Sequence, residues 1–182
     1  MAELDLSKKA IKKKILLCIL YHNKKINLKK LLNSIQLSFV GEVLIINDGI
    51  DYHFKKKNFK KLKFINKPKQ KFSISINRNV ALNYAKKKKF ELLLFLDSDI
   101  IPQKNLVRNH LKSHARSTSL FVVGGPVLPS ANLKNMNFWE FLDGRLSWFT
   151  SIDQNKSHYV DWPYHLPTCN LSIRVKEFFK KT

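Results

Sequence analysis

The sequence predicts an α/β fold in which a mostly parallel sheet is flanked by helices. Two observations lead to this class. Four apolar runs of strand length alternate along the chain with segments whose apolar residues recur at helical spacing. Three of these runs stop directly at polar residues, as expected when the carboxyl ends of parallel strands meet at one edge of a sheet. With 182 residues, the chain has the size of a single domain over residues 1–182 and can build an ordinary hydrophobic core.

The first two runs form a predicted βαβ unit. The first strand, Ile15–Leu20, ends at the polar residues Tyr21-His22-Asn23. A helix follows, with Asn27 as its expected N-cap, because four apolar residues recur at i, i+3, i+4 and i+7: Leu28, Leu31, Leu32 and Ile35. The second strand, Val43–Ile46, stops at Asn47-Asp48-Gly49. A right-handed crossover then places both strand ends at one edge of the sheet.

A second unit leads to the most apolar strand. The lysine-rich stretch Lys55–Lys71 contains a short strand candidate, Leu62–Ile65. Residues Ser73–Lys89 are expected to form a helix whose inner stripe consists of Ile76, Val80, Ala81 and Tyr84. The strand Leu92–Leu96 is too short for a helix and is bounded by charge on both sides, which indicates burial on both faces of a parallel sheet. It ends at Asp97-Ser98-Asp99, so all three polar strand ends should meet at one crevice.

The second half of the chain differs in character. A polar helix is expected over Lys104–His114, followed by a strand, Leu120–Val123. Residues Asn137–Trp162 are rich in aromatic and polar residues without a clear period, which fits an acceptor-side loop region, an amphipathic surface helix, or side chains that simply cover the sheet. Finally, Leu166–Arg174 leads into a short helix, Val175–Lys180.

Asp97 and Asp99 form a candidate metal site. With one residue between them, an extended backbone would place both carboxylates on the same face, close enough to repel each other. A divalent cation would remove that repulsion, and ligation by oxygen alone suits Mn²⁺ or Mg²⁺. The alternative is a turn at the strand end in which the two residues cap the next segment.

The charge and the cysteine content limit which partners and which cellular compartment are expected. Lys and Arg number 34 against 13 Asp and Glu, a net charge of +21, and 29 of the basic residues are lysines in short scattered runs. This pattern favours a solvated face, with peripheral contact at an anionic inner membrane surface as an alternative, over specific nucleic-acid binding, where arginine predominates. Cys18 and Cys169 lack metal-type spacing and indicate reduced core residues, and no apolar stretch reaches membrane-spanning length. We therefore expect a cytoplasmic protein.

Five motifs, in this order, resemble those of the family 2 glycosyltransferases, whose fold is the Rossmann-like GT-A fold. They are Tyr21-His22-Asn23, Asn47-Asp48-Gly49, Asn77-Arg78-Asn79-Val80-Ala81, Phe95-Leu96-Asp97-Ser98-Asp99 and Asn170-Leu171-Ser172-Ile173-Arg174. The likeness spans about residues 14 to 178. It implies metal-dependent, inverting transfer of a sugar from a nucleotide-diphosphate-sugar donor to a glycan or lipid-linked acceptor, as in polysaccharide or glycolipid synthesis. Residues 14–102 would form the nucleotide-binding half and 103–182 a partial acceptor-side half.

The resemblance also implies roles for individual residues. The donor nucleotide would be bound by Tyr21, Asn23, Asp48, Arg78 and Asp97. The metal would be held by Asp99 together with Asp97, and the acceptor side would include Asn170 and Arg174. Simpler structural roles stay open for three of these residues: an aromatic core residue at Tyr21, a turn residue at Asp48 and a structural ion pair at Arg78.

Two departures from the family pattern affect the expected activity. Asn47 stands where many family members have an acidic residue, so this chain is expected to recognise the base of the donor nucleotide differently from those members. An inverting transferase also needs a general base, which in the family lies downstream of the last motif, where only Glu177 follows here; Asp143 and Asp161 are the other candidates. The chain therefore resembles a member truncated at its C-terminal end, expected to bind donor and metal but to transfer sugar poorly.

Two rival functions were weighed. Nucleotidyl transfer to a sugar phosphate would need a glycine-rich phosphate loop after the first strand, but residues 1–40 contain no glycine. The non-enzymatic rival is an impaired transferase fragment that acts as a nucleotide-binding or basic membrane-surface scaffold. Mn²⁺-dependent protection of the fold by a uridine or guanosine diphosphate, lost in Asp99→Ala, would separate a transferase site from a basic membrane-surface scaffold.

Overall fold

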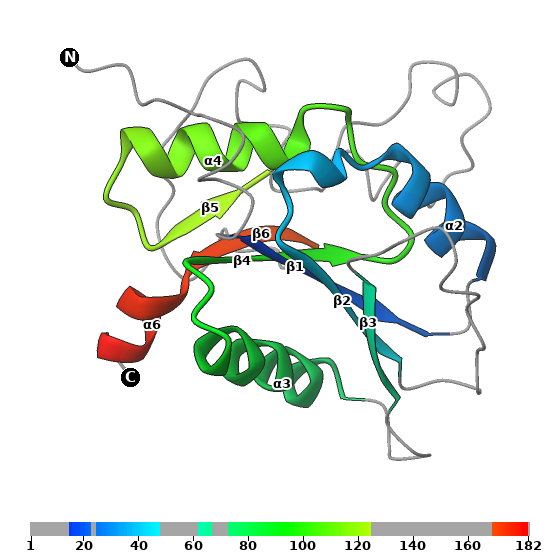
Figure 1. Ribbon diagram of the computed structural model, residues 1–182, viewed down its shortest axis with the longest axis horizontal. Coiled ribbons are helices and arrows are strands. Elements are labelled where there is room, and N and C mark those ends of the chain that lie inside the picture. Colours follow the sequence, from blue (N-terminus) through cyan, green and yellow to red (C-terminus); the bar gives the residue numbers. More distant parts are fainter. Residues whose placement is uncertain (1–14, 23–24, 48–61, 67–72, 125–168, 182) are drawn as a thin grey trace, which may run out of the picture.

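The described residues form one six-stranded sheet in the order β3-β2-β1-β4-β6-β5 (Figure 1). The structure is a computed structural model, and it describes residues 15–22, 25–47, 62–66, 73–124 and 169–181. The strands are β1 (Ile15–Tyr21), β2 (Glu42–Asn47), β3 (Leu62–Asn66), β4 (Leu92–Asp97), β5 (Phe121–Val123) and β6 (Asn170–Arg174). Helices cover both faces of this sheet, which confirms the predicted α/β class with a mostly parallel sheet.

The four strands from the first half of the chain are all parallel. β1 pairs with β2 on one side and β4 on the other, and β2 pairs with β3. β1 and β4 are buried along almost their whole length, since helices cover both faces of the sheet and leave no solvated side. This double burial explains why their sequences are continuous apolar runs.

The sequence interpretation missed strand β6, which lies between β4 and β5 and is antiparallel to both. Its residues alternate strictly, with apolar Leu171 and Ile173 between polar Asn170, Ser172 and Arg174. Such alternation is typical of a strand whose two faces meet different environments. The segment does lead into the last helix, as predicted, but it is also a strand, which the sequence analysis did not identify. The second half of the chain adds its two described strands to the same sheet.

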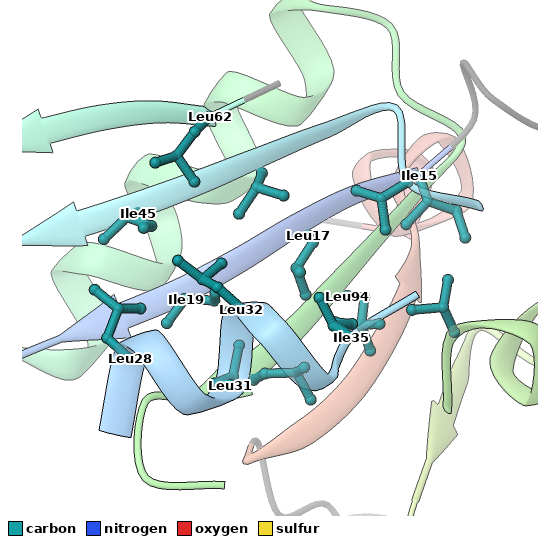
Figure 2. Packing of buried hydrophobic residues seen from close by; sticks show 14 of the residues in the cluster. Ile15, Leu17, Ile19, Leu28, Leu31, Leu32, Ile35, Ile45, Leu62 and Leu94 are labelled. Carbon is teal, nitrogen blue, oxygen red and sulfur yellow. The ribbon is translucent and has the colours of Figure 1, made fainter. Parts of the chain in front are cut away.

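One face of the sheet is covered by α2 (Lys25–Ser34), the 3₁₀ helix η1 (Leu37–Phe39) and α4 (Leu106–Arg116). Figure 2 shows the apolar stripe of α2 lying against side chains of β1, β2, β3 and β4. Leu17 and Leu94 are fully buried in this layer, so truncating either to alanine would cost about 2–5 kcal/mol of stability. The predicted stripe of α2 is confirmed, but the helix begins at Lys25, so Asn27 is not its N-cap.

The other face is covered by α3 (Ile74–Lys87) and α6 (Val175–Lys181). Ser73 caps α3, because its side-chain oxygen accepts a hydrogen bond from the Ile76 amide at 3.3 Å. The predicted inner stripe is partly wrong: Ile76 is 53% exposed, and the buried residues are Asn77, Ala81, Leu82 and Ala85. Asn77, Ala81 and Ala85 recur every four residues and define the buried stripe, so Ile76 lies to one side of it on the helix.

None of the helices in the described part of the chain has both the length and the apolar character required to cross a bilayer.

Candidate functional site at the carboxyl edge of the sheet

The ends of β1, β2 and β4 lie side by side at one edge of the sheet. Tyr21 is the register partner of Asn47, and Leu20 is the partner of Asp97. Asn47 is buried and donates a hydrogen bond from Nδ2 to Asn66 Oδ1 at 3.3 Å, which ties the end of β3 to the same edge. Tyr21 is 3% exposed and packs in the cluster beneath α2. The structure thus brings together the polar strand ends, as the sequence predicted; Asn23 and Asp48 lie outside the described residues.

Asp97 is the last residue of β4, and Asp99 follows it in a turn rather than in the extended segment that the sequence analysis assumed. The strand ends at Asp97, and the Ile100 amide donates to the Asp97 carbonyl oxygen at 3.3 Å, which closes a turn over Ser98 and Asp99. The argument from an extended backbone is therefore wrong. Burial raises the pKa of Asp97, and the nearby charge of Asp99 raises it further. Asp99 is exposed and Asp97 is partly exposed, so both reach the solvent side of the edge.

Arg78 faces Asp97 across the edge from helix α3. Arg78 Nη2 lies 3.9 Å from Asp97 Oδ1, with 22% and 40% of the two side chains exposed. Burial lowers the pKa of Arg78 and raises the pKa of Asp97, and in each case burial outweighs the attraction of the partner charge. Within the part of the chain that the structure describes, Arg78 Nε is buried without a hydrogen-bond partner. A guanidinium with a long ion pair and an unused donor can bind a further anion.

Asp97 and Asp99 are the described residues that could hold a divalent cation, together with ligand atoms from elsewhere. No group of three or more His, Cys, Asp or Glu residues capable of holding a metal occurs among the described residues. The protein would therefore supply two carboxylates, and phosphate oxygens and water would complete the octahedron preferred by Mg²⁺ and Mn²⁺. Burial and the Asp99 charge both raise the pKa of Asp97, and a cation would counter both effects.

Strand β6 brings Asn170, but not Arg174, to this edge. Asn170 is the register partner of Leu96, and the Asp97 amide donates to the Cys169 carbonyl at 3.1 Å. Arg174 pairs with Leu92 at the opposite end of the strand. Its side chain caps the end of α4 there, donating from Nε to the Ser119 carbonyl at 3.1 Å and from Nη2 to the carbonyls of Ser117, at 2.7 Å, and His114.

The sequence analysis did not single out three polar residues that lie next to Asn170. They are His110 and His114 on α4 and Ser172 on β6, and all three are buried. Burial lowers the pKa of both histidines to about 4, so both are neutral at pH 7. A signal was present in the sequence, since the histidines are four residues apart on a predicted helix and therefore on one face.

A comparison with protein families decides the relationship. The model of the family described as "Glycosyl transferase family 2" matches residues 17–181. The chain belongs to glycosyl transferase family 2. Its matched region contains every described candidate residue at the carboxyl edge of the sheet, from Tyr21 to Asn170. A search of curated proteins gave no match.

Solved structures with the same fold include other glycosyltransferases. S. aureus TarS 1–349 is similar with a TM-score of 0.51 and 23% identity, over 66% of this family 2 chain and 40% of TarS 1–349. TarS 1–349 in complex with UDP-GlcNAc matches with the same TM-score and identity, over 66% of this chain and 38% of that one. The mannosyltransferase PcManGT from Pyrobaculum calidifontis, in complex with GDP-Man and Mn²⁺, has a TM-score of 0.50 and 14% identity, over 67% and 37% of the two chains. The family 2 chain thus spans about two fifths of the length of these structures, which share its GT-A fold.

Proposed function

We propose that this chain is the donor-binding part of a glycosyltransferase that moves a sugar from a nucleotide-diphosphate-sugar to an acceptor hydroxyl, with inversion at the anomeric carbon. The observation that carries the proposal is the arrangement of Arg78, Asp97 and Asp99. A partly buried guanidinium, with an Nε–H that has no hydrogen-bond partner among the described residues, faces Asp97 at the edge where three parallel strands end, and the charge of Asp99 acts on the same carboxylate. Such an edge is where open α/β sheets bind their ligands.

The proposed roles follow from the chemistry of a nucleotide sugar. Arg78 donates charge-assisted hydrogen bonds to the diphosphate. Asp97 and Asp99 hold Mn²⁺ or Mg²⁺, which when bound offsets the charge that develops on the departing nucleotide diphosphate. Tyr21, Asn23 and Asp48 serve the nucleoside at the ends of β1 and β2. The UDP-GlcNAc complex of TarS and the GDP-Man and Mn²⁺ complex of PcManGT support this choice of donor and metal.

Transfer also needs a base at the acceptor hydroxyl, and the described residues offer none at the edge. Glu177 is exposed on α6, which begins at Val175, after the end of β6 that lies away from Asp97. We propose that the acceptor is a glycan or a lipid-linked sugar. The lysine-rich surface would then serve peripheral contact with an anionic membrane, at a cytoplasmic location.

Ligand protection of the fold tests the donor site directly. Thermal unfolding is followed with UDP, GDP, UDP-GlcNAc and GDP-mannose, each with Mn²⁺ or with a chelator. A ligand at about 100 times its Kd stabilises the native state by about 2.7 kcal/mol, which is a clear shift in Tm. We expect that in Mn²⁺ either UDP and UDP-GlcNAc or GDP and GDP-mannose raise the Tm of the unmodified chain. This increase in Tm should be lost in Asp99→Ala and Arg78→Met.

Two matched controls accompany these variants. Glu177→Ala removes an exposed carboxylate from α6, and Asn83→Ala changes an exposed position on the same helix as Arg78. Both should keep the protection of the unmodified chain. If no nucleotide protects the unmodified chain, or if chelation leaves protection unchanged, the proposed metal-dependent donor site is refuted.

A further inference from the structure

Helix α4 carries a stripe of three cations on its outer side. Arg108, Lys112 and Arg116 are spaced four residues apart, so they lie on one face of the helix, over about 12 Å of its axis. Arg108 and Arg116 are exposed and Lys112 is partly exposed, and the buried residues of α4 lie on the opposite side of the helix. Figure 1 shows α4 on the same face of the sheet as α2, away from α3 and α6. The cationic stripe therefore lies on the outer surface of this layer.

The cationic stripe does not stabilise the helix that carries it. Cations four residues apart repel each other, and Arg108 stands in the first turn, where the helix dipole disfavours positive charge. Only Arg116, in the last turn, is favoured by the dipole. Among the described residues no carboxylate forms an ion pair with the stripe, and α2, η1 and α4 contain no Asp or Glu. An anionic partner from outside would offset this repulsion.

Two of the three cations are arginines, which are rare in this chain. The sequence has 29 lysines against five arginines, so a run of lysines alone indicates little about a partner. Four arginines lie in the described residues. Arg78 and Arg174 have partners within the fold, whereas Arg108 and Arg116 are exposed. Arginine can bind a phosphate group through two N–H donors at once, so the stripe fits a surface that carries phosphates.

An exposed isoleucine precedes the cationic stripe. Ile101 is 66% exposed in the segment that joins β4 to α4, and the exposed Lys104 follows three residues later. The Leu106 amide donates a hydrogen bond to the Gln103 carbonyl at 3.0 Å, which ties this segment to the start of the helix. Contact with a membrane surface combines buried apolar area with attraction to anionic headgroups, whereas a soluble polyanion would use the cations alone. Ile101 therefore favours a membrane over a nucleic acid.

Helix α3, on the other face of the sheet, lacks this combination. Its exposed isoleucines, Ile74 and Ile76, lie in the first turn, about 15 Å along the axis from the lysines at its other end, Lys86–Lys89. Cations at the end of a helix are favoured by its dipole, so these lysines already have a structural role. Lys86 Nζ also lies over the Phe179 ring, 4.1 Å from its centroid.

We propose that Ile101 and the cationic stripe of α4 form the surface through which this protein binds an anionic phospholipid membrane. The inference rests on the membrane contact proposed above and deepens it, because it assigns the contact to α4 rather than to the lysine content as a whole. The three cations bind lipid phosphates, and Ile101 enters the region between the headgroups. Arg78 lies on α3, on the other face of the sheet, so contact through α4 leaves it accessible to a nucleotide.

Sedimentation with vesicles tests this surface on the full 182-residue chain. Vesicles of phosphatidylserine and phosphatidylcholine are compared with vesicles of phosphatidylcholine alone, which should bind weakly. Each cation near an anionic bilayer contributes about fivefold in affinity, so the triple variant Arg108→Gln, Lys112→Gln, Arg116→Gln should weaken binding about a hundredfold. Its Tm should be equal or higher, because the repulsion along α4 is removed.

A matched triple variant removes the same charge from the other layer. Lys87→Gln, Lys88→Gln, Lys89→Gln replaces three exposed lysines at the end of α3 and should weaken binding by less than about threefold, since salt screens charges that do not touch the bilayer. Equal losses in the two triple variants would mean that diffuse charge drives binding, and would overturn the proposal.

Ile101→Ser separates a membrane from a soluble polyanion. The substitution should weaken binding to the anionic vesicles about threefold to tenfold and leave any binding of a single-stranded RNA oligonucleotide unchanged. Unchanged vesicle binding in Ile101→Ser, or tighter binding of the RNA than of the vesicles, would overturn the proposal. Absence of vesicle binding by the unmodified chain would refute the membrane contact altogether, whereas the donor site is tested separately by the protection of the fold in Mn²⁺.

Discussion

Gly124→Ala provides the sharpest test of the packing around Asn170. The added Cβ would lie 2.1 Å from Asn170 Nδ2 and 2.9 Å from its Cγ, whereas ordinary contacts begin at 3.4 Å. The described residues include no glycine with positive φ, so the backbone at Gly124 accepts alanine without strain. The whole effect of the substitution therefore comes from the side chain of Asn170.

The magnitude follows from what the carboxamide must give up. To clear an overlap of more than an ångström it has to rotate away, which breaks the 2.8 Å bond to His110 and leaves a buried N–H donor unsatisfied. Leaving such a donor unsatisfied costs about 1–3 kcal/mol, and overpacking adds about 1 kcal/mol or more. We expect a loss of about 2–4 kcal/mol in the free energy of unfolding. Without the clash, glycine to alanine would stabilise by about 0.4–1 kcal/mol through the unfolded state.

Urea unfolding of four proteins measures the effect as a double-mutant cycle: the unmodified chain, Gly124→Ala, Asn170→Ala and the double variant. In the Asn170→Ala background the carboxamide is absent, so Gly124→Ala should become neutral or slightly stabilising. The sign of the substitution then reverses between backgrounds, with a coupling energy of about 2 kcal/mol or more. Equal destabilisation in both backgrounds, or a fully stable single variant, would refute the packing described here.

Three further predictions concern stability, pH and the metal. Arg174→Lys should lower the free energy of unfolding by about 1–3 kcal/mol in urea, because an ammonium group cannot serve three backbone carbonyls in the fork geometry of arginine, and nucleotide affinity should stay unchanged. Burial lowers the pKa of His110 and His114 from 6.5 to about 4 in the native state, so the unfolded chain binds more protons between these pH values. The free energy of unfolding should therefore decrease as pH falls from 6.5 to 4, by about 3 kcal/mol for His110 alone. The decrease should be less steep in His114→Gln. Because burial raises the pKa of Asp97, Asp97→Asn should leave Tm equal or higher, while calorimetry shows about tenfold or more loss of Mn²⁺-dependent nucleotide affinity.

The strand ends at the site could be predicted because local sequence determines them. The apolar runs of β1, β2 and β4 need burial on both faces, and parallel pairing then places Tyr21, Asn47 and Asp97 at one edge without further information. The conformation after β4 could not be obtained in this way. Ser98 and Asp99 turn instead of continuing the strand, and the Ile100 amide donates a hydrogen bond to the Asp97 carbonyl across this turn, a contact that the apolar pattern does not reveal.

The position of β6 in the sheet was beyond local reasoning for a different reason. Five residues with three polar side chains carry a weak strand signal, and their partner Leu92–Leu96 lies almost eighty positions earlier in the chain. Register between such distant segments depends on what covers each face. Leu171 and Ile173 require the apolar layer under α3, which leaves the polar residues of β6 facing α4.

The polar contacts between α4 and β6 follow from the similar spacing of residues along a helix and along a strand. Residues four apart on a helix are separated by about 6.0 Å along its axis, and residues two apart on a strand by about 6.6–6.8 Å. His110 and His114 therefore advance along α4 at nearly the same pace as Asn170 and Ser172 along β6, and each histidine meets a polar partner. A strand with apolar residues at both positions would leave two buried imidazoles unsatisfied, so the histidine pair and the alternating polar residues of β6 require each other.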